Sequence, residues 1–355
     1  MSMSDDSTRP PTVREVAKHA NVSRQTVSRV INNSTSVSPQ TRNRVLASIR
    51  LLGYEPNTLA QSLATRKSQV IGLVLPDITQ PFYPQIALGV EDMARKSGYS
   101  VFLCHTSGNT ALETESLERL RRHRVAGVVN CNSRLDNAAL KAAIGNHAPM
   151  VLVNSEAADS FGSVIWSGYD HGAWLAVQHL LSIGRRQIAY IGVSPENHID
   201  QTRIRGYRKA LNEAGVPASS DLVTHGPNTL RGGYDAIAAL RSQRKDIDAV
   251  FVFNDLMALG VMRYALTHDI DVPQQLAIAG FGGMEVAGVT TPGLTTIAVP
   301  LYTLGTTAVL ELIKLMDGHE SHHIRINTEP RLIVRGSTVA SARDEWVTED
   351  FSDSL

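Results

Sequence analysis

The chain has 355 residues, 43% hydrophobic and 19% charged, which is enough for two or three domains with ordinary globular cores. Its 34 basic and 34 acidic residues cancel in total. Residues 1–67, however, carry ten Lys/Arg against four Asp/Glu, a net charge of +6, and the remainder carries −6. No apolar run is long enough to span a bilayer, and the polar stretch MSMSDDSTRPP leads us to expect no signal peptide. We therefore expect a cytoplasmic protein with a basic, nucleic-acid-binding head on an acidic body.

Three short helices are predicted over residues 12–53. Thr12 and Glu15 have the spacing of a capping box at the start of the first helix. Asn21 marks a turn, and Ser23 caps a second helix with apolar residues on one face and polar residues on the other. Two helices joined by a tight turn are typical of a helix-turn-helix, whose second helix enters the DNA major groove. The alternative is an ordinary helical hairpin at the surface.

The polar face of the second helix carries the predicted base readers. Gln25 has the side chain that bonds adenine through two hydrogen bonds, and Arg24 and Arg29 have the side chain that bonds guanine in the same way. A third helix begins at Ser38-Pro39 and stops at Gly53. Neighbouring polar groups would position the phosphates. The predicted DNA contacts of these helices are Thr12, Val13, Ser23, Arg24, Gln25, Thr26, Ser28, Arg29 and Asn32.

Three long sequence words follow one another in this part of the chain: VREVAKHANVSRQTVSRVIN, VSPQTRNRV and YEPNTLAQSL. In these words the chain resembles the lactose-repressor family of bacterial transcription factors, and the resemblance continues to about residue 340. The resemblance implies that the hinge at 54–67 becomes helical on the operator. There Leu63 would act as a wedge in the minor groove, beside Asn57 and Ala60. From the residues alone the hinge is equally a plain linker, because an isolated helix of this length is marginal in water.

Beyond residue 68 the chain alternates short apolar runs with amphipathic segments. Such alternation predicts parallel sheets with right-handed crossovers, and the strands are too many for one compact sheet. We therefore expect an α/β effector domain of two doubly wound lobes, as in periplasmic sugar-binding proteins. A disordered lead-in at 1–11 and an acidic tail at 341–355 would flank the whole. The predicted lobes are an N-lobe of about 68–166 with 298–327 and a C-lobe of about 167–297 with 328–340.

The sequence contains no catalytic or cofactor motif. It has no Walker loop, nucleophile elbow, metal-ligand spacing or dinucleotide fingerprint, so we predict neither an enzyme nor a bound cofactor or metal. The leading interpretation is a transcriptional regulator, with a repressor favoured over an activator. A sugar-binding protein with a helical appendage and an architectural DNA binder without an effector are the alternatives. Because one helix-turn-helix reads few base pairs, we expect a homodimer on a palindromic operator.

A small effector is expected in the cleft between the lobes, beyond the carboxyl ends of the strands. The residues that follow the strands are mostly polar and uncharged, as suits a polyol. Each of them can equally be a loop or cap residue, as Asn254 would be for a helix starting at Leu256. The segments concerned are Asp77 to Tyr83, Thr106-Ser107, Asn130 to Ser133, Asn154-Ser155, Asn254-Asp255 and Gly282-Gly283.

The family resemblance assigns some of these positions. It implies that Arg203 reaches effector oxygens and that Asn254 is the asparagine of the effector site, with Tyr83 or Phe82 as the aromatic contact. Gly282 stands where many members have an aspartate, which favours a ligand with its own negative charge. We therefore expect a sugar acid such as gluconate, with a neutral sugar or a purine as alternatives. The predicted effector contacts are Phe82, Tyr83, Asn132, Asn154, Arg203, Asn254 and Gly282.

Overall fold

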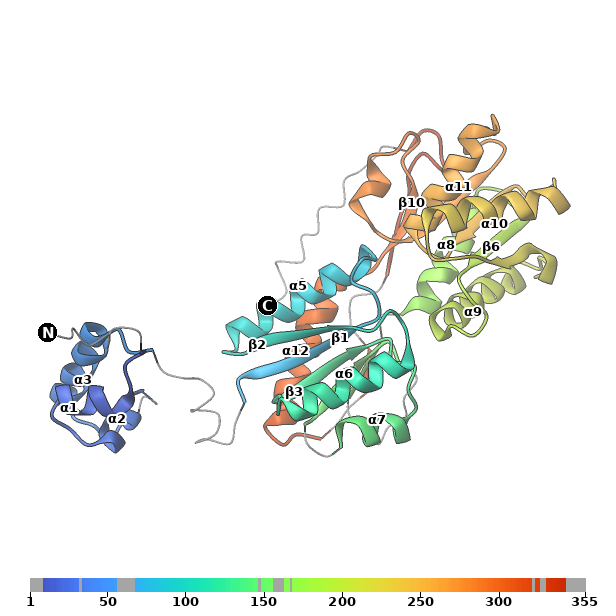
Figure 1. Cartoon of the computed structure of the whole chain (residues 1–355). Helices are drawn as coiled ribbons and strands as arrows, with labels where there is room; N and C mark the ends of the chain where they lie inside the picture. Colours follow the sequence, from blue (N-terminus) through green and yellow to red (C-terminus); the bar gives the residue numbers. More distant parts are fainter. Residues whose placement is uncertain are drawn as a thin grey trace, which may run out of the picture. The chain divides into compact units, whose positions relative to one another are not determined.

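The computed structural model describes most of the chain and divides it into two compact units, Met1–Gln69 and Val70–Leu355 (Figure 1). No helix among the described residues is long and apolar enough to cross a membrane. Several predicted contacts, namely Asn32, Asn57, Ala60 and Leu63, lie outside the described residues, as do most of the hinge, the lead-in and the tail. The described residues are 9–31, 34–55, 68–145, 148–155, 163–166, 168–320, 323–325 and 330–342.

The described residues of the first unit form three helices: α1 (Val13–His19), α2 (Arg24–Ile31) and α3 (Pro39–Leu52). The predicted capping interaction at the start of α1 is present. Oε2 of Glu15 accepts the Thr12 N–H at 2.6 Å and the Thr12 hydroxyl at 2.8 Å. Asn21 has a φ of 50° in the turn that follows. The Ser23 hydroxyl accepts the Thr26 N–H at 3.1 Å and so caps α2. These local signals explain why the helix-turn-helix forms where the sequence predicts it.

A small apolar core holds the three helices together. Val16 of α1, Val27 of α2 and Val45 of α3 are fully buried in it. Arg42 of α3 stabilises the C-terminal end of α2, because its guanidinium donates hydrogen bonds to the carbonyls of Val30, at 3.5 Å, and of Ser34. The orientation of α2 is therefore fixed by contacts on its inner face and at its C-terminus, and its outer face takes no part in them.

The described residues of the second unit form two six-stranded sheets, which confirms the predicted pair of α/β lobes (Figure 1). Every strand pair in the described part of the chain is parallel except β10 (Thr295–Ala298) with β12 (Arg331–Ile333). The first sheet has the order β11 (His323–Arg325), β5 (Ser163–Trp166), β4 (Met150–Val153), β3 (Gly127–Cys131), β1 (Val70–Leu75), β2 (Ser100–His105). The second has the order β12 (Arg331–Ile333), β10 (Thr295–Ala298), β9 (Ala277–Gly282), β8 (Ala249–Val252), β6 (Ile188–Gly192), β7 (Val223–His225).

Helices cover the faces of both sheets. The first sheet packs against α5 (Phe82–Lys96), α6 (Thr110–Arg122), α7 (Asn137–Ile144) and α12 (Leu301–Met316). The second packs against α8 (Tyr169–Ser182), α9 (His198–Glu213), α10 (Leu230–Gln243) and α11 (Asp255–Thr267), with short 3₁₀ turns η1 (Ser220–Leu222) and η2 (Glu285–Gly288). Because α12 and β11 return to the first sheet after β10, and β12 then rejoins the second, each lobe is assembled from separate chain segments. The three-residue strand β7 was not predicted, since it is too short to show a pattern.

Candidate functional site

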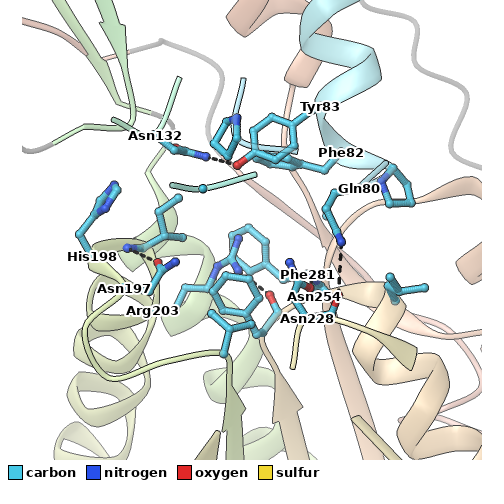
Figure 2. A pocket seen from close by; sticks show the side chains of 18 of the residues that line it. Gln80, Phe82, Tyr83, Asn132, Asn197, His198, Arg203, Asn228, Asn254 and Phe281 are labelled. Atoms are coloured by element: carbon cyan, nitrogen blue, oxygen red, sulfur yellow. Dashed lines mark hydrogen bonds between the residues drawn. The ribbon is translucent and has the colours of Figure 1, made fainter. Parts of the chain in front are cut away.

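A cavity of about 110 Å³ lies between the strand ends of the two sheets (Figure 2). Helices α5, α9 and α11 all begin at it. Figure 2 shows Tyr83 and Asn132 on one wall, with Arg203 and Phe281 on the opposite one. The lining residues are Pro76, Gln80, Pro81, Phe82, Tyr83, Gly108, Asn132 and Arg134 of the N-lobe, with Val193, Asn197, His198, Ile199, Arg203, Asn228, Phe253, Asn254, Leu256, Phe281, Gly282 and Met284 of the C-lobe.

Arg203 supplies a buried positive charge to the C-lobe wall. Its side chain is 3% exposed, and its guanidinium carbon lies 4.0 Å from the ring centre of Phe281 and 4.2 Å from that of Phe253. Nη1 donates to the Phe253 carbonyl at 2.6 Å, whereas Nε has no hydrogen-bond partner in the described part of the chain. Burial lowers the pKa of Arg203, but a guanidinium stays protonated at neutral pH. The cavity therefore contains a cation with an unused donor.

Asp200 lies close to Arg203 but is saturated by other donors. Its carboxylate accepts the Tyr190 hydroxyl at 2.6 Å, the Val193 N–H at 2.5 Å and the Ser194 N–H at 2.9 Å. Asp200 is fully buried beneath the loop that follows β6. Asp200 therefore offsets part of the positive charge of Arg203 from within the protein and does not line the cavity.

Asp255 is a second fully buried acid that interacts electrostatically with Arg203. It accepts the Thr296 hydroxyl at 2.5 Å and the Met284 N–H at 2.8 Å, and burial raises the pKa of Asp255. Gly282 passes directly above it with a φ of 134°, a conformation that suits glycine. A Cβ built on Gly282 would lie 3.5 Å from Oδ2 of Asp255. The wall at this point is bare backbone over a buried carboxylate.

The N-lobe wall is neutral and polar. Asn132 has a φ of 52°, and its amide donates to the Tyr83 hydroxyl at 2.5 Å. The Oδ1 atom of Asn132 is buried and accepts no hydrogen bond from any described residue. Burial raises the pKa of Tyr83, so the phenol stays protonated. Phe82 packs edge-on against Tyr83 with 4.7 Å between the ring centres.

Hydrogen bonds join the two lobes at the cavity. Gln80 of the N-lobe donates to the Asn228 carbonyl at 3.3 Å, and Asn254 donates to the Asn228 side chain at 2.6 Å. His198 donates through Nε2 to the Asn154 carbonyl at 2.5 Å. Asn254 also accepts the N–H of Met257 at 2.9 Å, so it caps α11 as well as lining the cavity.

Six of the seven predicted effector residues line the cavity, and Asn154 does not. Its side chain is 1% exposed and donates to the Tyr169 hydroxyl at 3.0 Å, so only its carbonyl faces the other lobe. The prediction missed Asn197, His198 and Asn228, which precede or begin helices of the C-lobe. Val193 was missed too, although it follows β6 and the strand-end rule covers it. The structure describes no group of three His, Cys, Asp or Glu residues that could hold a metal ion.

The second candidate surface is the outer face of α2. Arg24, Gln25, Ser28 and Arg29 are exposed there, and Thr26 is half-buried against its cap. No side-chain hydrogen bond or ion pair among the described residues occupies Arg24 or Gln25. Thr12 and Val13, at the start of α1, are half-buried. This row of free donors on one helix face has the chemistry that base edges and phosphates require.

Both regions match known proteins. Residues 12–57 match "Bacterial regulatory proteins, lacI family", and residues 177–338 match "Periplasmic binding protein-like domain". Catabolite control protein A of Priestia megaterium is 32% identical over 329 residues, which cover 92% of this chain and 99% of that protein. The transcriptional regulator CelR in complex with cellobiose is 31% identical at a TM-score of 0.70, covering 92% and 99% of the two chains. The lac repressor dimer bound to operator and the anti-inducer ONPF has a TM-score of 0.83 at 27% identity, covering 93% and 99%.

Proposed function

The chain belongs to the lacI family of bacterial regulatory proteins, and we propose that it is a repressor whose operator affinity is controlled by a sugar acid bound between its lobes. The relatives named above are DNA-binding transcriptional regulators, so regulation of transcription is the premise. The class of effector and the sign of regulation are the proposal. A sugar-binding protein without DNA function is disfavoured by the exposed donors of α2.

The guanidinium of Arg203, whose Nε has no hydrogen-bond partner among the described residues, carries the effector proposal. No aspartate or glutamate is among the described residues that line the cavity. A carboxylate on the ligand would form a charge-assisted pair with the guanidinium of Arg203 at the wall of the cavity. A neutral sugar could offer Arg203 only hydroxyl oxygens, which are weaker hydrogen-bond acceptors for a cation than a carboxylate is. The chemistry of the cavity therefore favours an anion.

The acidic residues that could accept hydrogen bonds from a neutral sugar do not line the cavity. Asp77, beside the cavity, accepts the N–H of Thr79 at 2.9 Å and its hydroxyl at 2.7 Å. Asp200 is locked by three donors. Glu285 is exposed in η2 and does not line the cavity. None of the three is placed to replace the carboxylate that Gly282 lacks.

The DNA side of the proposal follows from α2. One helix of this length reads few base pairs, so two copies on a palindromic operator are proposed, with Arg24, Gln25 and Arg29 at the base edges. Leu63 is proposed as the minor-groove wedge of the hinge. The effector would bridge the lobes and favour one lobe orientation, which is how ligand affinity becomes coupled to DNA affinity.

Calorimetry with gluconate and glucose tests the effector class. We expect gluconate to bind and glucose to bind at least about tenfold more weakly, since the ionic pair with Arg203 contributes about 1.4 kcal/mol or more. An operator gel shift with each compound then reports whether binding changes DNA affinity. Tighter binding of any neutral aldose than of every acid tested would overturn the proposal.

A further inference from the structure

A second arginine, Arg134, lines the cavity from the N-lobe. It follows β3, two residues beyond Asn132, and is exposed to solvent. No hydrogen bond or ion pair engages its guanidinium among the residues that the structure describes. Arg203 and Arg134 thus approach one cavity from different lobes, and only the first is used by the proposed carboxylate.

The backbone of Arg134 is held by a buried carboxylate. Glu113 of α6 is 5% exposed and accepts the Asn130 amide at 2.8 Å, the Ser133 hydroxyl at 2.5 Å and the Arg134 N–H at 3.3 Å. These contacts fix the turn after β3. Arg134 is therefore fixed at the cavity by its main chain, unlike an arginine on a loose surface loop.

The electrostatics of the cavity suit more than one negative charge. Helices α5 and α9 begin at the lining residues Phe82 and His198, and α11 begins directly after Asn254, so three partial positive charges point toward it. Asp200 and Asp255 offset part of this charge, but both are fully buried and hydrogen-bonded within the protein. Glu113, which accepts the Arg134 N–H, has both its oxygens engaged by its three donors.

We propose that the effector is a dianion, with a carboxylate on Arg203 of the C-lobe and a second anionic group on Arg134 of the N-lobe. The second group is a phosphate monoester or another carboxylate at the far end of the same sugar chain. This inference rests on the proposed function. It assigns Arg134 as a specificity-determining residue, and it gives the ligand one charge in each lobe. Such a ligand holds the lobes together more strongly than a monoanion does.

Titration of the full-length protein with gluconate, 6-phosphogluconate and glucarate tests the proposal. We expect at least one of the two dianions to bind more tightly than gluconate, by about fivefold or more, with the stronger one identifying the second group as phosphate or carboxylate. Arg134→Gln should remove that advantage and leave gluconate binding unchanged. Arg134→Lys should restore part of it, because the charge returns without the fork. Raising the salt concentration should shrink the advantage.

Arg122→Gln is the matched control, since Arg122 is exposed on the same lobe and does not line the cavity. Its affinities for all three compounds should equal those of the unmodified protein. If gluconate binds and neither dianion binds more tightly, or if Arg134→Gln weakens all three alike, the second anion site is refuted and the sugar-acid proposal stands. If glucose binds more tightly than all three acids, both proposals are refuted.

Discussion

In the helix-turn-helix, different residues serve DNA binding and stability. In the cavity between the lobes, a single residue serves both ligand binding and stability. In α2, buried valines hold the helix to its neighbours, and exposed Gln25 and Arg29 are free to touch DNA. In the cavity, Arg203 is both the proposed ligand anchor and a buried side chain stacked between aromatic rings. A substitution on the DNA face should therefore change binding alone. A substitution in the cavity should change binding and folding together.

Arg203→Ala should have the largest effect. It leaves a gap between the rings of Phe253 and Phe281 and removes the counter-charge near Asp200, at a cost of about 3 kcal/mol in the free energy of unfolding. It should also abolish the response of operator binding to the effector. Arg208→Ala, at an exposed position of the same helix, is the control. Urea unfolding and calorimetry measure both effects, and an unchanged stability would break the comparison.

Glu113→Ala should cost about 2–3 kcal/mol of stability, because Asn130 and Ser133 lose their acceptor inside the protein. The turn after β3 should loosen, so ligands that use Arg134 should lose affinity. Glu115→Ala, exposed two residues along α6, provides the reference for an ordinary surface change. Thermal unfolding of the two variants side by side decides the matter. Equal melting temperatures would show that the Glu113 network is not structural.

Gln25→Ala should weaken operator binding by about 1–3 kcal/mol and relax specificity at one base position. Stability should change by less than about 0.5 kcal/mol, since the side chain is exposed. Gln40→Ala is the control, because it removes the same amide group from an exposed position on α3. It should leave operator affinity unchanged. Binding to a panel of operator variants is the measurement. If all variants lost affinity equally, Gln25 would be a phosphate contact and not a base reader.

His179 offers the smallest effect and a dependence on pH. Its Nε2 lies 2.8 Å from the Thr338 hydroxyl, and burial lowers the pKa of His179 below its usual 6.5. Below pH 6.5 the unfolded chain takes up a proton there before the folded protein does. Stability is therefore lost as the pH falls from that value toward the folded pKa. His179→Gln should flatten the stability profile in this window, as measured by unfolding at pH 7 and pH 5.

How far the sequence predicts each region follows from the range of its contacts. The first unit was predicted down to its caps, because Thr12, Asn21 and Ser23 act within a few residues of where they stand. The cavity depends on chain segments that meet only in the folded lobes. Asn228 reaches Gln80 from 148 residues away, and no local pattern marks either as a partner of the other.

Asn154 shows the opposite failure. Its place after β4 made it a strand-end candidate, but its amide turns inward to Tyr169. The strand-end rule predicts where a backbone emerges and not which way a side chain points. The strand-end rule does not reach Arg203, which stands within α9, so only the family resemblance pointed to it.

Gly282 bears on how this protein could change over evolutionary time. Every glycine codon is one base change from a codon for an acidic residue, so the genetic distance to an acid at this position is minimal. The structural distance is greater, because a side chain at a φ of 134° is strained and would place a new carboxylate near that of Asp255. A lineage that gained the acid would need a compensating change in the loop or at Asp255 first. A change of ligand preference at this wall should therefore require two substitutions rather than one.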